Sequence, residues 1–482
     1  MIVTSPIHTG TLVIGSGPGG AISATLLAEA GREVLMVEEG EDLALNAAPH
    51  FSSTEMLMKY RNAGVGVALG QTKLAWVEGC CVGGGSEVNR GLYHRTPGYI
   101  LNDWRRRYGV EALDQHSLSP HFAACEAVAA VEYARERAPE ISNRLLKGSQ
   151  KMGWHATEAP RLFKYPSRDA LVESGKQSMS TTFIPRFRAA GGQLVATTRI
   201  HRLRRDGRVW KAEARCRAPD GNWARVDIRA EQVVVACGAV QTPMLLRRSG
   251  LRRNIGDTLR FHPMVKVVAE FESPLNRPGD FDPVHQVREF EPRIGMGCSI
   301  STPTQLGAAL VGRADAWDLV HARGAQMGLY YVQSSGGTAR VRHLPGFADP
   351  LVRVRFGSDE LEQLAAGLAR LAEVLFAAGA CRVIPCIPGY PDLHSPADIA
   401  RLPARLAPAD GSMTSVHVFS SCPMGENRDL CATNSFGQVH GVDGLYINDA
   451  SLLCTPTGVN PQGTVMAIAH RNAVAMLERS RR

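Results

Sequence analysis

The glycines near the start of the chain have the spacing of a dinucleotide-binding turn. Residues 15–20 read Gly-Ser-Gly-Pro-Gly-Gly, a Gly-x-Gly-x-x-Gly pattern, and the acidic Glu38 follows. In such a turn Gly15 allows the tight bend, Gly17 lets the backbone approach a pyrophosphate, and Gly20 lets a helix pack on a strand. Glu38 would accept hydrogen bonds from the ribose hydroxyls and repel a 2′-phosphate, which argues against NADP. The predicted dinucleotide-binding residues here are Gly15, Gly17, Pro18, Gly19, Gly20 and Glu38.

The elements that would position this turn can be identified on both sides of it. Residues 11–14 are a short apolar strand, residues 21–30 have helical spacing and end at Gly31, and residues 33–37 form a second strand that leads to Glu38. This order of strand, turn, helix and strand predicts an α/β, Rossmann-like domain with a parallel sheet, whose helix N-terminus faces the phosphates. The turn alone does not distinguish FAD from NAD.

Four later segments resemble, in the same order, motifs of the glucose–methanol–choline (GMC) oxidoreductases. They are residues 79–89, residues 238–250, residues 254–263 with Asn-Ile-Gly-Asp and His-Pro, and residues 444–461 with Gly-Leu-Tyr-Ile-Asn-Asp-Ala-Ser and Val-Asn-Pro. The resemblance extends from residue 11 to about residue 475. It implies FAD as the cofactor and a second, substrate-binding domain built on an antiparallel sheet backed by helices.

The resemblance also implies a discontinuous domain organisation. The FAD-binding domain would comprise residues 1–110, 185–262 and 428–482, and the substrate domain residues 111–184 and 263–427. Within the substrate domain, apolar alternation predicts strands over residues 265–272, 329–332 and 352–356, and helical spacing predicts a helix over residues 359–377.

A glycine-rich loop is expected to contact the flavin. Glycines at positions 83–85 leave a surface without side chains against which the isoalloxazine can lie, and Ser86 and Asn89 offer polar groups. Family members with covalent flavin carry His directly before this Asn, whereas this chain has Val88, so we expect non-covalent FAD, with His94 as the alternative attachment point. The predicted FAD contacts are Gly83, Gly84, Gly85, Ser86, Asn89, Ile200, Gly238, Asp449, Ala450, Pro461 and Gln462.

Two residues are expected to carry the chemistry. Residues 415–425 resemble the family's block around its active-site histidine, which implies that His417 accepts the proton of an alcohol hydroxyl. Asn460 matches the second catalytic position and would bind the substrate oxygen. It also fits a helix N-cap before Pro461, and the two roles are compatible. Hydride would pass from the carbinol carbon to flavin N5, giving an aldehyde, and oxygen or another acceptor would reoxidise the flavin.

The substrate is less well defined by the sequence. The Ser-Ser-Cys-Pro-Met-Gly stretch after His417 is similar to flavin oxidases of aminoglycoside antibiotic pathways, which implies a primary hydroxyl of an amino sugar. Four acids between residues 280 and 291 could meet such an amine or could form a solvated loop: Asp280, Asp282, Glu289 and Glu291. The alternatives are a fatty-alcohol or sterol oxidase and a non-redox lyase of the same family.

Composition excludes several other classes of protein. The chain has 482 residues, 44% hydrophobic and 21% charged, which is typical of a globular protein with at least two domains. The net charge of +8 is spread over short basic clusters such as residues 105–107, without the basic stripe of a nucleic-acid binder. The eleven cysteines lack metal or disulfide spacing. With no signal peptide or membrane span, the sequence predicts a cytoplasmic, metal-free enzyme without stable membrane insertion.

Overall fold

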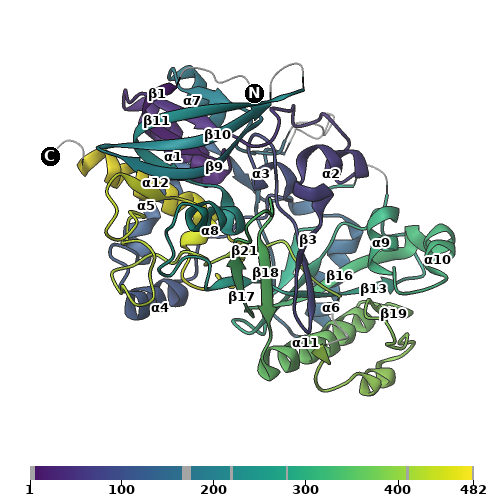
Figure 1. Ribbon diagram of the computed structural model, residues 1–482. Helices are drawn as coiled ribbons and strands as arrows, with labels where there is room; N and C mark the ends of the chain where they lie inside the picture. The colour runs from purple at the N-terminus through teal and green to yellow at the C-terminus, as the bar shows by residue number, and fades with distance from the viewer. Residues whose placement is uncertain (1–5, 166–174, 218–220, 278–279, 409–411, 480–482) are drawn as a thin grey trace.

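Two sheets organise the computed structural model, which describes residues 6–165, 175–217, 221–277, 280–408 and 412–479. In Figure 1 the seven-stranded sheet with α1 and α12 occupies the upper part of the molecule, and the nine-stranded sheet with α11 occupies the lower part. The predicted α/β fold is confirmed. We call the seven-stranded sheet the cofactor sheet and the nine-stranded sheet the substrate sheet, after the roles that the sequence predicts for them.

The cofactor sheet is built on buried, apolar parallel strands. Its parallel part has the order β8-β2-β1-β11-β22, and Leu12, Val13 and Val233 are fully buried in it, as strands covered on both faces require. The strands are β8 (Gln193–Val195), β2 (Val34–Val37), β1 (Ile7–Ile14), β11 (Trp223–Val235) and β22 (Leu445–Ile447). The first part of β11 forms an antiparallel meander with β10 (Val209–Arg217) and β9 (Thr198–Asp206).

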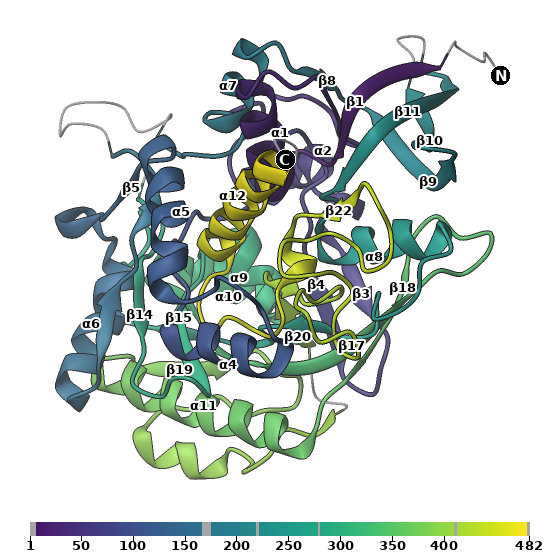
Figure 2. The ribbon, with the colours of Figure 1, turned by 90° about the vertical axis from the view of Figure 1, so that its left-hand side faces the viewer.

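Helices extend from the carboxyl ends of these strands. Helix α1 (Pro18–Glu29) follows β1, and α8 (Gly238–Arg248) follows β11. The C-terminal helix α12 (Gln462–Arg479) packs against α1 and against α5 (Gln115–Val128), beside which it lies in Figure 2. The carboxyl ends of β1, β11 and β22 therefore meet at one edge of the sheet, where ligands of open α/β sheets bind.

The substrate sheet is mainly antiparallel, and helix α11 (Ser358–Ala377) packs against β13, β15, β16 and β19 through buried leucines such as Leu364 and Leu371. In spatial order the strands are β3 (Gly66–Ala68), β4 (Lys73–Trp76), β20 (Ser412–Ser415), β13 (Met264–Glu270), β16 (Met327–Ser334), β15 (Ile294–Cys298), β14 (His285–Val287) and β6 (Ala156–Glu158), with β19 (Arg382–Pro385) also on β13. Strands β13 and β16 and helix α11 confirm three of the predicted elements.

A smaller four-stranded sheet lies beside the substrate sheet. Its order is β18 (Leu351–Arg355), β17 (Gly336–Arg342), β12 (Leu259–Phe261) and β21 (Val418–Phe419). The third predicted strand, over residues 352–356, is therefore present but belongs to this sheet. Because β12 pairs with β21 in antiparallel register, His262 and His417, at the ends of these strands, become neighbours. No helix among the described residues has both the length and the apolar character needed to span a bilayer.

Candidate active site

A cavity of about 530 Å³ is lined by both main sheets. Most of the predicted cofactor residues face it, whereas Gly20, Gly83 and Ser86 do not. The predicted residues that line the cavity are Gly15, Gly17, Pro18, Gly19, Glu38, Gly84, Gly85, Asn89, Ile200, Gly238, Asp449, Ala450, Pro461 and Gln462, together with the proposed catalytic residues His417 and Asn460.

The glycine turn brings backbone against backbone. Gly15 has a φ of +98°, and a side chain there would collide with the carbonyl of Ala236. A side chain at Gly19 would collide with the carbonyl of Asn448, whereas a Cβ at Gly17 would meet nothing within 4 Å. Because α1 begins after Gly17 without a side-chain cap, its N-terminal end is available to an anionic group in the cavity. These features fit the pyrophosphate of a dinucleotide.

Glu38 connects the glycine turn with the second glycine loop. Its Oε2 accepts hydrogen bonds from the backbone N–H of Ser16 (2.9 Å) and from the Ser16 hydroxyl (2.7 Å), and its Oε1 accepts from Gly40 (3.0 Å). The Ser16 hydroxyl in turn accepts a hydrogen bond from the N–H of Gly83 (3.0 Å). Burial raises the pKa of Glu38. The carboxylate thus orders two loops while lining the cavity.

Asp449 has a similar connecting role at the neighbouring strand end. Its Oδ2 accepts hydrogen bonds from the N–H of Gly238 (2.9 Å) and the hydroxyl of Thr242 (2.5 Å). Its Oδ1 accepts from the N–H (2.8 Å) and the hydroxyl (2.5 Å) of Ser451. The carboxylate therefore joins the segment after β22 to the start of α8, and burial raises its pKa.

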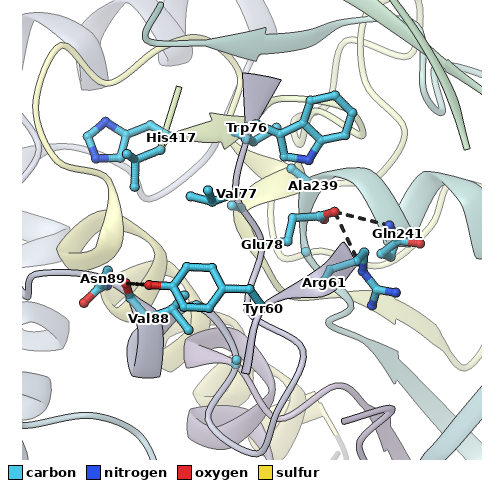
Figure 3. A pocket seen from close by; sticks show the side chains of 18 of the residues that line it. Tyr60, Arg61, Trp76, Val77, Glu78, Val88, Asn89, Ala239, Gln241 and His417 are labelled. Atoms are coloured by element: carbon cyan, nitrogen blue, oxygen red, sulfur yellow. Dashed lines mark hydrogen bonds and ion pairs between the residues drawn. The ribbon is translucent and has the colours of Figure 1, made fainter. Parts of the chain in front are cut away.

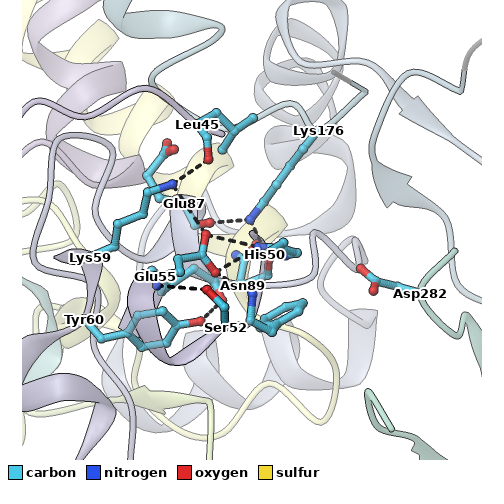
Figure 4. Close-up of polar contacts among 12 residues, drawn as sticks. Leu45, His50, Ser52, Glu55, Lys59, Tyr60, Glu87, Asn89, Lys176 and Asp282 are labelled. Carbon is cyan, nitrogen blue, oxygen red and sulfur yellow. Dashed lines mark hydrogen bonds and ion pairs between the residues drawn. The ribbon is translucent and has the colours of Figure 1, made fainter. Parts of the chain in front are cut away.

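A buried lysine forms hydrogen bonds with the backbone of the predicted flavin loop. The Lys176 ammonium donates hydrogen bonds to the carbonyls of Glu87 (2.5 Å) and Asn89 (2.6 Å), at the end of α3 (Gly85–Val88), as Figure 4 shows. Burial lowers the pKa of Lys176 to about 8. The Asn89 amide donates to Gln462 at the start of α12, so two predicted cofactor residues contact each other.

Val88 and His94 bear on how the flavin is attached. Val88 lines the cavity, and its carbonyl accepts a hydrogen bond from the hydroxyl of Tyr60 (3.1 Å). His94 is buried and interacts with the side chain of Asn460, and it is absent from the described residues that line the cavity. Desolvation lowers the pKa of His94 to about 4.

One wall of the cavity contains a chain of polar contacts among Glu39, Arg61, Glu78 and Gln241, which the sequence analysis did not predict. Arg61 forms a bidentate ion pair with Glu39 (3.1 and 2.8 Å), and its Nε lies 3.8 Å from Glu78. Gln241 donates a hydrogen bond to the same Glu78 (3.3 Å). Figure 3 shows the Glu78 carboxylate joined by dashed lines to both Arg61 and Gln241, with His417 and Asn89 toward the opposite side. Arg61 and Glu78 stand in no motif, so the sequence offered nothing that singled them out.

The reacting end brings together residues from four separate segments. The Nδ1 atoms of His262 and His417 are 2.9 Å apart, and the Nε2 of His417 is 3.2 Å from the amide nitrogen of Asn460. Gln286 donates a hydrogen bond to the Oδ1 of Asn460 (3.1 Å). Both predicted catalytic residues are thus in contact. His262 was noted only as part of a motif, and Gln286 was missed.

This network assigns the tautomer of His417. Because Gln286 donates to the Oδ1 of Asn460, the amide nitrogen of Asn460 faces His417 and donates to its Nε2. The Nε2 atom therefore carries a lone pair, and the proton of the neutral ring resides on Nδ1, where it is donated to His262. Burial lowers the pKa of His417 to about 4, so the ring is neutral at physiological pH. A neutral imidazole whose Nε2 carries a lone pair can act as a base once a substrate hydroxyl takes the place of the Asn460 amide at that atom.

The four acids between residues 280 and 291 do not face the cavity. None of them is among its described lining residues, and each has a partner within the protein. Asp280 accepts from the N–H of Arg277, Asp282 pairs with Arg161, Glu289 accepts from the N–H of His155, and Glu291 pairs with Arg288. Each of the four therefore has a partner within the protein, outside the described lining of the cavity.

Comparison with known proteins identifies the class of this site. The chain matches two models described as GMC oxidoreductase, over residues 56–264 and 333–469, and an FAD-binding domain model over residues 8–79. An uncharacterized GMC-type oxidoreductase of Sinorhizobium fredii is 34% identical over 99% of this chain and 96% of its own length.

Relatives with a named activity are more distant. A long-chain-alcohol oxidase of Arabidopsis thaliana is 25% identical over 96% of this chain and 68% of its own length. A 5-(hydroxymethyl)furfural oxidase of Methylovorus is 23% identical over 97% and 98%, respectively. The crystal structure of a pyridoxine 4-oxidase from Mesorbium loti has the same fold, with a TM-score of 0.75 at 16% identity over 98% of this chain and 99% of that one.

Two alanine substitutions in the glycine turn should have different effects. In Gly19→Ala the new methyl collides with the backbone at Asn448, so we expect a loss of about 1–3 kcal/mol in the free energy of unfolding. In Gly17→Ala the methyl meets no protein atom but projects toward the phosphate position, so stability should be kept while the Kd for FAD rises roughly tenfold or more. Urea unfolding of apoprotein and FAD titration measure the two effects, and equal stability losses would contradict this assignment.

The support of the flavin loop by Lys176 can be tested with Lys176→Met. The substitution keeps the length of the side chain but leaves two buried carbonyls without donors, which should destabilise the protein by about 1–3 kcal/mol. We also expect weaker FAD binding, measured by flavin fluorescence during dilution. Lys151→Met, at an exposed lysine of α6 (Glu140–Met152), is the matched control. A loss of stability no greater than that of the control would exclude the proposed support.

Proposed function

Because the chain belongs to the GMC oxidoreductase family and has an FAD-binding fold, we propose that it oxidises an alcohol to the aldehyde, with His417 as the base. The observation that carries this proposal is the unprotonated Nε2 of His417, which lies 3.2 Å from the Asn460 amide nitrogen at the cavity. A base and a hydrogen-bond donor within contact of each other are what removal of a hydroxyl proton requires.

The proposed roles follow from the hydrogen-bond network. The substrate hydroxyl would replace the hydrogen bond between Asn460 and His417. Its proton would go to the Nε2 of His417, and the Asn460 amide would then donate to the substrate oxygen and orient it. The Nδ1–H of His417 keeps its hydrogen bond to His262. This contact fixes the plane of the His417 ring while the proton is transferred to Nε2. FAD, when bound, accepts the hydride that leaves the carbinol carbon, so that loss of a proton and a hydride converts the alcohol into the carbonyl compound.

The residues around the cavity also support a dissociable cofactor. Val88, which offers no attachment atom, stands before Asn89, and His94 is not among the described residues that line the cavity. We therefore propose non-covalent FAD, held at the residues predicted from the sequence, with oxygen or another acceptor reoxidising it. Relatives named as long-chain-alcohol oxidases and 5-(hydroxymethyl)furfural oxidase support an alcohol substrate. The acids near residue 285 do not line the cavity, so they give no support for binding the amine of an amino sugar there.

The proposal predicts that alcohols reduce the bound flavin and that His417 is needed for it. His417→Ala should retain FAD but lower the rate of anaerobic flavin reduction by about 10²–10⁴-fold, because the proton acceptor is lost. The assay uses amino-sugar, aliphatic, sterol and aromatic alcohols, and His321→Ala, at an exposed histidine of α10 (Ala316–Arg323), is the control. Bound FAD that no alcohol reduces would instead favour the non-redox lyase.

The pH dependence of flavin reduction should report the low pKa of His417. The base must be unprotonated, so kcat/KM should fall as the pH drops through about 4 and should stay level between pH 6 and 8. Stopped-flow reduction by a non-ionising alcohol across pH 3.5–8 measures this limb, with the flavin spectrum reporting that the cofactor stays bound. An acid limb centred near ~6.5, the ordinary value for histidine, would contradict the assignment of a desolvated base.

A further inference from the structure

A single lysine lies on the substrate-domain side of the cavity. Lys266 is in the middle of β13, and its side chain is half-buried among the residues that line the cavity. The register places it directly across from Tyr331 on β16, two residues along from the pair Met264 and Gln333. Because side chains on a strand alternate between faces, all four project from the same face of the sheet into the cavity.

The neighbouring strand adds an unused hydroxyl to this face. Thr414 on β20 pairs with Met264, so it shares the face with Lys266 and also lines the cavity. Its Oγ1 is buried and has no hydrogen-bond partner. A buried hydroxyl without a partner is unfavourable unless a ligand supplies one. The face therefore combines an ammonium, a free hydroxyl and the amide of Gln333.

No carboxylate of the described residues pairs with the Lys266 ammonium. Four acids line the cavity, and all four are held by other groups: Glu38 by Ser16 and Gly40, Glu39 by Arg61, Glu78 by Gln241 and Arg61, and Asp449 by Thr242 and Ser451. Burial lowers the pKa of Lys266, as expected for an ammonium without a counter-ion. An anion in the cavity would offset this penalty.

Polar contacts connect this face to the proposed catalytic pair. The Tyr331 side chain, across from Lys266, interacts with Gln286, whose amide donates to Asn460. Arg90, which also lines the cavity, places a second positive charge near Tyr331 and offsets part of the rise in the pKa of Tyr331 that burial causes. Lys266, Arg90 and the proposed catalytic pair therefore line one cavity, and Tyr331 and Gln286 connect the lysine's face to Asn460.

We propose that Lys266, with Thr414 and Gln333, binds a carboxylate of the substrate, so that the enzyme prefers alcohols that carry an anionic group at their other end. This inference rests on the proposed alcohol oxidation, whose hydroxyl site at His417 and Asn460 it extends. A hydrogen-bonded charge pair in a desolvated cavity should favour the anionic substrate about 10–100-fold over a neutral alcohol of the same shape.

The test compares matched alcohols with the FAD-loaded enzyme. The pairs are 4-(hydroxymethyl)benzoate with 4-methylbenzyl alcohol and 6-hydroxyhexanoate with 1-hexanol, and the readout is the ratio of kcat/KM for anionic and neutral members. We expect a ratio of about 10–100 in the native enzyme, a ratio near 1 in Lys266→Met, and partial retention in Lys266→Arg. Lys73→Met, at an exposed lysine of β4, should keep the native ratio.

A binding measurement separates this inference from the proposed function. Benzoate has no oxidisable hydroxyl, and its binding is followed by the change in the flavin spectrum. If no alcohol reduces the flavin, the proposed function fails, while tighter benzoate binding by native enzyme than by Lys266→Met still supports the anion site. Three results would overturn the proposed anion site. The native enzyme could give a ratio at or below 1, or Lys266→Met could leave the ratio unchanged. Lys266→Met could also weaken the affinity for FAD while benzoate binding stays unaltered.

Discussion

Two buried carboxylates determine how the cofactor edge is assembled. Glu38 and Asp449 each accept hydrogen bonds from a neighbour two residues along the chain and from a segment that is distant in the sequence, at Ser16 and Gly238 respectively. Through Ser16, Glu38 reaches the loop at Gly83, and Asp449 reaches the start of α8. An ionised carboxylate in the interior is unfavourable unless its oxygens are satisfied, so removal of any donor penalises the whole arrangement. Glu38 thus holds the end of β2 to the turn after β1, and Asp449 holds the end of β22 to the start of α8 after β11.

The reacting end depends on the same edge. His417 lies between β20 and β21, which belong to the substrate sheet and the smaller sheet, whereas Asn460 precedes α12, which packs against α1. Helix α1 in turn starts at the glycine turn. The 3.2 Å contact between His417 and Asn460 therefore joins the two parts of the molecule directly over the cavity. A shift of α1 at its glycine turn would be transmitted through α12 to this contact.

Most of the cofactor fold could be predicted because its determinants are local in sequence. A buried strand, the Gly15–Gly20 turn and an acid after the next strand occur within about thirty residues, so each constrains the others. His417 and Asn460 were predicted from motifs and proved to be in contact. Lys266, Arg61 and Gln286 could not be predicted, because strand register and ion pairing, which no short motif encodes, bring them to the cavity. The acids near residue 285 are the opposite case. They are close together in the sequence, which suggested an amine-binding site, but they pair with other residues of the protein.

The two lysines near the cavity show how partners separate structural from binding charges. Lys176 is buried but donates to two backbone carbonyls, so its charge is stabilised by the loop that it supports. Lys266 is less buried, yet no described carboxylate pairs with it, and it lies beside an unpartnered hydroxyl at Thr414. Water in the cavity can solvate this ammonium before substrate binds, but an apolar substrate that displaced the water would leave the charge bare. An anionic substrate replaces that water with a counter-charge, so the same lysine that favours a carboxylate also opposes a purely hydrocarbon alcohol.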